Sequence, residues 1–252
     1  MLLDVRSEGR KLGTLPVVRL SMVATFVITV GLAALASWTI AGHLDDDPAR
    51  NGLHVTPEGE GFQAVYFGQA GMVVLGVLAV SGEFVGGQVR TSLLAVPGRL
   101  RFLAAKAAVV ALLAVLVALV TVPSAFMAAQ LGLGDHGLPF SDVLDGAILV
   151  PMAGAVLYWV LLALLAAGCT VLARSAVAPL AILVALVLAL SQFLSMVTDL
   201  ADLLPDRAGA LMYMEASEDT FGLGAVQGGL VMVTWVVAVW LVAAVRFVRR
   251  DA

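Results

Sequence analysis

The stretch AILVPMAGAVLYWVLLALLAAGCTVLARSAVAPLAILVALVLALSQFLSMVT, residues 147–198, decides the fold class, because Arg174 is its single charged residue. Each apolar run beside Arg174 exceeds the roughly 20 helical residues that cross a bilayer. Pro179 follows shortly and suits the first turn of a new helix. The stretch therefore predicts two membrane-spanning helices joined by a tight hairpin.

The whole chain has the same apolar character. Of its 252 residues, 61% are hydrophobic and 13% are charged, with a net charge of −4 and a mean hydropathy of +1.03. An ordinary soluble domain is roughly half apolar and about one quarter charged. A soluble protein of this size could not bury so much apolar surface. The composition therefore excludes a soluble enzyme or a nucleic-acid-binding domain.

Six apolar runs are long enough to span a membrane. The runs exceed strand length and lack the alternation of a membrane β-barrel, so helices are the structure that satisfies the backbone in lipid. We predict an all-α polytopic protein, with residues 1–252 forming a single six-span transmembrane domain. The predicted spans are 20–41, 62–82, 107–129, 147–173, 175–198 and 221–245.

Basic residues predict the direction of the spans. Twelve of the 14 Lys and Arg residues fall before the first span, between the second and third, at Arg174, or after the sixth. Only Arg50 and Arg207 fall in the other loops, where 14 of the 18 acids also lie. The positive-inside rule then places both termini in the cytoplasm. We expect a multi-pass protein of the cell membrane.

Common catalytic motifs are absent from the sequence. It has no H-E-x-x-H pair, no G-x-S-x-G and no G-x-x-x-x-G-K-[ST] loop, and its one cysteine is Cys169. We therefore predict no catalytic, cofactor-binding or metal-ligating residue and no nucleic-acid partner. The predicted spans also contain no Asp, Glu, Lys, Arg or His, which disfavours a proton-coupled carrier. A sodium-coupled carrier remains possible, although the two halves of the chain show no convincing repeat.

Two basic segments are expected on the cytoplasmic side. Residues 1–19 mix charges with leucines, which is typical of an interfacial helix, or else of a basic tail held near anionic lipid. Residues 83–106 are too long for a connector and too apolar for a free loop. They predict a helix lying on the membrane, which either rests on lipid or presents a ridge to a cytoplasmic protein. The predicted anchors at the inner interface are Arg6, Arg10, Lys11, Arg99, Arg101 and Lys106.

The run EFVGGQVRTSL, residues 83–93, resembles the intracellular motif E-[FY]-x-x-G-x-[IVL]-R-[TS]-x-L of ABC-2 type transporter permeases. Pro97, Arg99 and Lys106 after it are also similar to that family, as is the opening segment 3–12. About forty residues carry this likeness, while the six-span layout covers the chain. Gln88 departs from the family pattern, in which Thr is frequent.

The resemblance implies the membrane subunit of an ATP-binding cassette exporter. Such permeases pair as dimers, of identical or different chains, and each binds a separate ATPase subunit that carries ATP and Mg²⁺. Residues 1–19 would form an elbow helix and residues 83–106 the coupling segment. The residues implied in ATPase coupling are Glu83, Gly86, Gly87, Arg90, Thr91, Ser92 and Leu93. Glu83 would hydrogen-bond near the inner end of the bundle.

The outer loop at residues 199–221 is expected to form short helices against the outer leaflet, because apolar residues alternate with its acids. Uncharged spans favour an apolar or amphipathic cargo. The alternative function is a membrane-bound sensor or interaction module, whose cytoplasmic helix would dock a regulator without transport. A neighbouring gene for a P-loop ATPase would favour the exporter, and one for a histidine kinase would favour the sensor.

Overall fold

The computed structural model describes residues 15–46, 56–84, 98–214 and 223–250, and all regular elements in these ranges are helical. Five of the six spans are single long helices. The remaining span, which is the fifth along the chain, consists of three consecutive helical pieces. The long helices are α2 (Pro16–Asp46), α3 (Pro57–Ser81), α5 (Arg99–Leu133), α6 (Gly146–Ala173) and α10 (Ala225–Arg250). The fifth span comprises α7 (Val177–Ala185), the π-helical turn η5 (Leu186–Leu190) and α8 (Ser191–Ser195).

Short elements connect the spans. A 3₁₀ turn, η2 (Gly82–Phe84), follows α3, and two more, η3 (Gly134–His136) and η4 (Asp142–Leu144), precede α6. After the fifth span come a 3₁₀ helix, η6 (Asp199–Leu203), and a short α-helix, α9 (Pro205–Ala210). Helical structure therefore occupies the first half of the segment at residues 199–221, while residues 215–222 lie outside the described ranges.

The structure confirms the six predicted apolar helices. Six helices in the described ranges are long and apolar enough to cross a membrane. The predicted ends differ most at the third span, which extends over Leu100–His136 rather than 107–129. Lys106 lies inside this helix because two charged side chains at its start do not interrupt helical hydrogen bonding.

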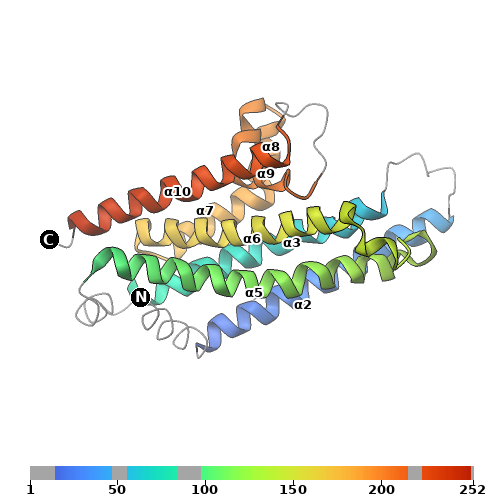
Figure 1. Ribbon diagram of the computed structural model, residues 1–252, viewed down its shortest axis with the longest axis horizontal. Coiled ribbons are helices and arrows are strands. Elements are labelled where there is room, and N and C mark those ends of the chain that lie inside the picture. Colours follow the sequence, from blue (N-terminus) through green and yellow to red (C-terminus); the bar gives the residue numbers. More distant parts are fainter. Residues whose placement is uncertain (1–14, 47–55, 85–97, 215–222, 251–252) are drawn as a thin grey trace.

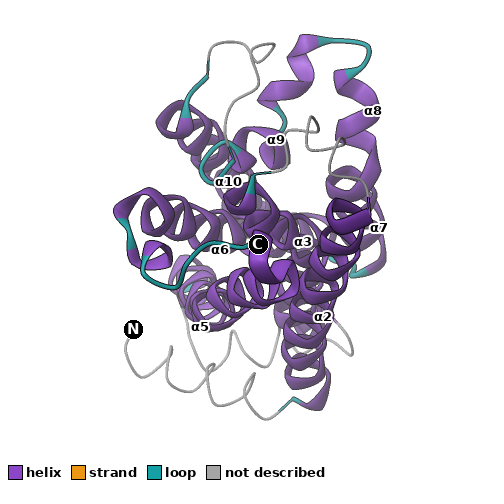
Figure 2. Ribbon diagram, turned by 90° about the vertical axis from the view of Figure 1, so that its right-hand side faces the viewer, coloured by secondary structure: helices purple, strands orange, loops and turns teal. Residues whose placement is uncertain are grey.

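Helix α3 occupies the centre of the bundle. It packs against α2, α5, α6 and α7. In its most apolar stretch, 61% of the residues are buried, against 22% in the corresponding stretches of α2 and α10. Helix α2 lies against α5 and α3, while α10 lies against α6 (Figure 1). Figure 2, seen from the end of the bundle, shows α3 near the centre of the spans. A Cβ atom at Gly76 of α3 would overlap the carbonyl oxygen of Ala163 on α6, so this crossing requires glycine.

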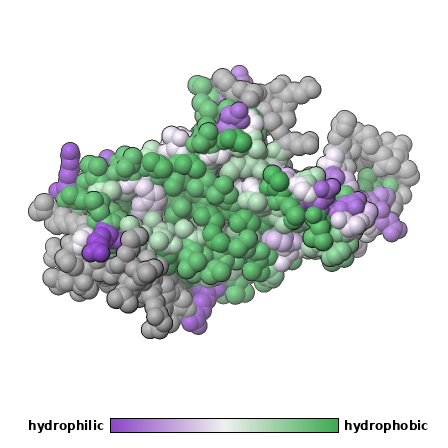
Figure 3. Space-filling model, in the orientation of Figure 1, coloured by the Kyte–Doolittle hydropathy of each residue, from purple (hydrophilic) through white to green (hydrophobic). Residues whose placement is uncertain are grey.

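The peripheral helices expose large apolar side chains. Leu20 is 69% exposed, Ile182 64% and Val226 74%. Figure 3 shows a mainly hydrophobic face along the middle of the bundle, with hydrophilic residues towards its ends. An apolar surface of this extent is unfavourable in water and suits contact with lipid tails. The helical structure and its surface together indicate a multi-pass membrane protein.

The chain reverses direction at Arg174. Arg174 adopts a left-handed conformation with φ of 51°, and its N–H donates to the Thr170 carbonyl oxygen over 2.9 Å. This geometry ends α6 in the manner of an αL C-cap. Helix α7 begins three residues later, and Pro179 lies in its first turn. The structure thus confirms the tight hairpin between the fourth and fifth spans.

The two ends of the bundle differ in charge. Helices α2 and α5 begin at the end where α3, α6 and α10 finish (Figure 1). We call this the basic end, because it carries Arg19, Arg101, Arg174 and Arg246. The opposite, acidic end carries Glu58, Asp135, Asp142 and Asp199.

Candidate functional site

Most of the predicted coupling residues lie outside the described ranges. These are Gly86, Gly87, Arg90, Thr91, Ser92 and Leu93, together with the predicted anchors Arg6, Arg10 and Lys11. Their roles therefore remain predictions. Of the other predicted residues, Arg99 begins α5, Arg101 is exposed in the first turn of that helix, and Glu83 and Lys106 are buried.

Glu83 and Lys106 form a buried ion pair at the basic end. The Lys106 ammonium lies 2.8 Å from a Glu83 carboxylate oxygen, and the two side chains are 2% and 4% exposed. The same ammonium lies 5.5 Å from the centre of the Phe102 ring. Phe102 in turn stacks on Phe247 of α10, with ring centres 6.2 Å apart. The pair therefore sits among packed side chains rather than at the bundle surface.

Lys106 lies elsewhere than the sequence led us to expect. It was expected among lipid headgroups, but its side chain points into the bundle. The reason is its helical phase: Phe102, Leu103, Lys106, Val109 and Val110 recur at the spacing of one helix face, and all are buried. Burial of the ammonium is acceptable there because Glu83 neutralises it.

This pair joins the two ends of the predicted coupling segment. Glu83 lies in η2, directly after α3, and Lys106 lies in the second turn of α5. Whatever the path of residues 85–97, their flanks are fixed to each other by charge. A displacement of this segment would consequently act on α3 and α5, which form much of the bundle core.

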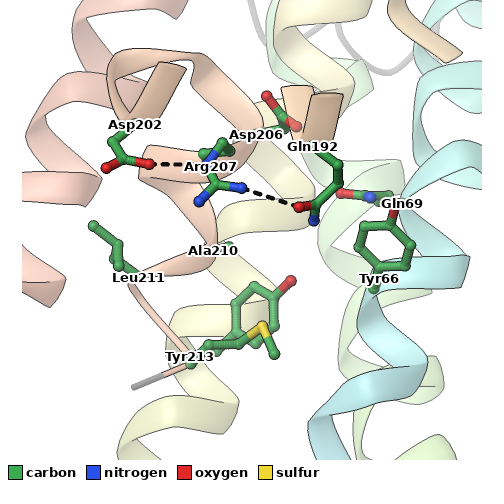
Figure 4. A pocket seen from close by; sticks show the side chains of 10 residues that line it. Tyr66, Gln69, Gln192, Asp202, Asp206, Arg207, Ala210, Leu211 and Tyr213 are labelled. Carbon is green, nitrogen blue, oxygen red and sulfur yellow. Dashed lines mark hydrogen bonds and ion pairs between the residues drawn. The ribbon is translucent and has the colours of Figure 1, made fainter. Parts of the chain in front are cut away.

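A polar cavity lies near the acidic end, between α3 and the segment that follows α8. Its volume is about 260 Å³. Figure 4 shows Tyr66 and Gln69 on the α3 side, facing Arg207 and Tyr213 from the other side. We call it the outer cavity; its lining consists of Tyr66, Gln69, Gln192, Asp202, Asp206, Arg207, Ala210, Leu211, Tyr213 and Met214.

The π-helical turn η5 forms part of the framework behind the outer cavity. A π turn leaves carbonyl groups without their usual i+4 donors. Gln69 Nε2 donates to the Val187 carbonyl oxygen over 2.7 Å, and the Tyr66 hydroxyl donates to that of Leu188 over 2.6 Å. The Tyr158 hydroxyl of α6 donates to Gln69 Oε1 and holds the amide in place. Side chains of α3 thus compensate for the wider turn.

Asp206 is the most unusual group in the lining. It is 6% exposed, and its Oδ2 accepts a hydrogen bond from the Ser191 hydroxyl. Its Oδ1 is buried and has no hydrogen-bond partner among the described residues. Burial raises the pKa of this carboxyl, while the Ser191 hydroxyl, nearby backbone N–H groups and the Arg207 charge partly oppose the rise. Asp206 therefore has an unused acceptor at the cavity.

Arg207 is already engaged on two sides. Its Nε lies 2.9 Å from Asp202 Oδ1, and its Nη1 donates to Gln192 Oε1 over 3.1 Å (Figure 4). Burial also raises the pKa of Tyr213, so its phenol stays neutral. With Asp206 ionised, two carboxylates and one guanidinium leave the lining with one net negative charge.

Sequence reasoning missed the outer cavity as a site. The polar side chains within the predicted spans, Gln69 and Gln192 among them, are expected to serve helix packing. Residues 199–221, which include Asp202 and Asp206, are expected to form short helices against the outer leaflet. Part of the signal was present, because Tyr66 and Gln69 are three residues apart on one helix and share its face. Asp202 and Asp206 lie in separate helices, η6 and α9, with the extended Leu204 between them. Only the packing of the short helices η6 and α9 against the spans brings these residues together.

Within the described ranges, no three His, Cys, Asp or Glu residues are grouped closely enough to hold a metal ion. No protein-family model and no curated protein matches this chain.

Proposed function

We propose that this chain is the membrane permease subunit of an ABC-2 type transporter, which exports an apolar or amphipathic substrate. The observation that carries the proposal is the buried Glu83–Lys106 pair, because it fixes both flanks of the segment that resembles the coupling motif. ATP hydrolysis would take place on a separate partner ATPase. The permease would act as a homodimer or heterodimer in the cell membrane, with both termini cytoplasmic.

The mechanism follows from this connection. ATP binding would close the partner ATPases and displace residues 83–106 on each permease. Because the Glu83–Lys106 pair links this segment to α3 and α5, its displacement would reach the bundle core. The helices would then move as packed units between an inward and an outward arrangement. The substrate would move along an apolar surface, which fits the exposed faces of α2, α7 and α10.

Co-purification tests the proposal. The tagged chain is expected to retain a P-loop ATPase from its native membrane, and the complex is expected to hydrolyse ATP. Arg90→Glu and Leu93→Asp, both within the motif, are expected to release the ATPase. The matched control Arg246→Glu changes an exposed residue of α10 at the basic end, outside residues 83–106, and is expected to retain the ATPase.

Two results would contradict the proposal. One is capture of a histidine kinase or another regulator in place of an ATPase, which would favour the sensor alternative. The other is an ATPase that stays bound, with unchanged activity, in both motif variants. Expression of each variant at the wild-type level in the membrane serves as the control for folding.

A further inference from the structure

We propose that the outer cavity binds an organic ammonium group, with Asp206 as the counter-ion and the Tyr66 and Tyr213 side chains around it. The inference uses only the cavity residues and does not rest on the proposed transport function. It names a ligand class, a protonated primary amine on a small apolar body, and a position near the acidic end of the bundle.

The first argument is the unused acceptor. Asp206 Oδ1 is buried and makes no hydrogen bond to the described residues, although the carboxyl lies near the backbone N–H groups of Asp206 and Arg207. A buried carboxylate oxygen without a hydrogen bond costs free energy, and an ionised one costs more. A ligand that donates a charge-assisted hydrogen bond to Oδ1 would remove this cost.

The second argument is that three of the neighbouring side chains already donate to other groups. Tyr66 donates to the Leu188 carbonyl oxygen, and Gln69 donates to that of Val187. The Arg207 guanidinium contacts Asp202 and Gln192. Asp206 Oδ1 therefore lacks a hydrogen bond among the described residues, and the lining carries one net negative charge. A single cation that donates a hydrogen bond would complement both.

The third argument separates an organic cation from a metal ion. Metal ions such as Ca²⁺ take six or more oxygen ligands, and the described residues provide no suitable group of acids. The lining instead contains the phenol rings of Tyr66 and Tyr213 and the apolar side chains of Leu211 and Met214. Aromatic faces attract ammonium groups, and the apolar side chains accommodate a short alkyl body.

Protonation of Asp206 should control this binding. Its carboxyl faces Arg207 and Asp202 on its own segment, Tyr66 on α3, Tyr158 on α6 and Tyr213 after α9. Because burial raises the pKa of Asp206, its carboxyl takes up a proton at a higher pH than a solvated aspartate does. The ammonium group must compete with that proton.

The test is isothermal titration of the full chain in lipid nanodiscs with n-butylammonium, n-butanol and Mg²⁺. We expect n-butylammonium to bind, and n-butanol and Mg²⁺ to bind at least about tenfold more weakly, as expected for loss of a charged hydrogen bond. Asp206→Asn should weaken n-butylammonium binding by at least the same factor. Asp199→Asn, an exposed acid on the same segment, should leave it unchanged.

A second measurement keeps the test decisive if Asp206→Asn fails to fold. In the wild-type chain, n-butylammonium affinity should fall by up to about tenfold per pH unit below the pKa of Asp206. Equal binding of n-butylammonium and n-butanol, binding of Mg²⁺ in its place, no binding, or pH-independent affinity across this range would each overturn the proposal.

Discussion

The Lys106 ammonium and the Glu83 carboxylate lie 2.8 Å apart inside the bundle, although 22 residues separate them along the chain. The contact joins the end of the second span to the start of the third. It also places the Lys106 ammonium inside the bundle, where the sequence predicted an anchor at the inner interface, and it gives Glu83 a cationic partner.

Removing one member of this pair should be far more harmful than removing both. Lys106→Met removes the cation that pairs with the buried Glu83 carboxylate, and breaking one side of a buried ion pair costs about 3–5 kcal/mol in typical proteins. The double variant Glu83→Gln/Lys106→Met should recover most of that loss. Thermal unfolding of the purified variants measures the coupling as a double-mutant cycle. Arg101→Met is the matched control and should leave the midpoint unchanged; additive single effects would contradict the prediction.

Gly76 should tolerate no larger residue. In Gly76→Leu the new side chain must displace the Ala163 carbonyl oxygen on α6, and such overpacking typically costs about 1–3 kcal/mol. We expect a lower unfolding temperature in detergent. Gly31→Ala in α2 is the control, because no atom outside the helix lies within 4 Å of its added Cβ. That change should be neutral or stabilise by up to about 1 kcal/mol; equal effects would be inconsistent with tight α3–α6 packing.

The Gln69 side chain should contribute more to the free energy of unfolding than an exposed glutamine of α3 does. Gln69→Leu removes the donor to the Val187 carbonyl oxygen and the acceptor for the Tyr158 hydroxyl. Leaving buried polar groups unpaired costs about 1–3 kcal/mol for each group. Gln63→Leu changes an exposed glutamine of the same helix and should be nearly neutral. Chemical or thermal unfolding measures the loss of stability in each variant, and equal losses in Gln69→Leu and Gln63→Leu would contradict the prediction.

The stability of the protein should depend on pH through Asp206. Its folded-state pKa is raised, so the folded chain binds this proton more tightly than the unfolded chain. The stabilisation is complete below the ordinary pKa of 3.8 and is lost as pH rises through the raised value. Asp206→Asn should remove this component, while Asp199→Asn should retain it. Unfolding midpoints measured at successive pH values provide the test; identical pH profiles in all three proteins would count against it.

The sequence predicts the spans well because long apolar runs have few alternatives in a membrane protein. The hairpin at Arg174 is equally readable, since a lone charge and Pro179 interrupt the apolar run. The burial of Lys106 is harder to predict from the sequence, because it depends on which face of α5 meets the bundle. The outer cavity is the hardest feature to predict, since Asp206 and Gln69 come to line one cavity only when α9 packs on the spans.

The π turn at Leu186–Leu190 also determines which way the end of the fifth span faces. One extra residue in a helical turn rotates everything beyond it by about 100°. Ser191 and Gln192 owe their approach to Asp206 and Arg207 to that rotation. A chain one residue shorter here would keep an apolar span of almost the same length, yet its polar face would point away from α9. The span and its alignment with α9 are therefore separate properties of this sequence.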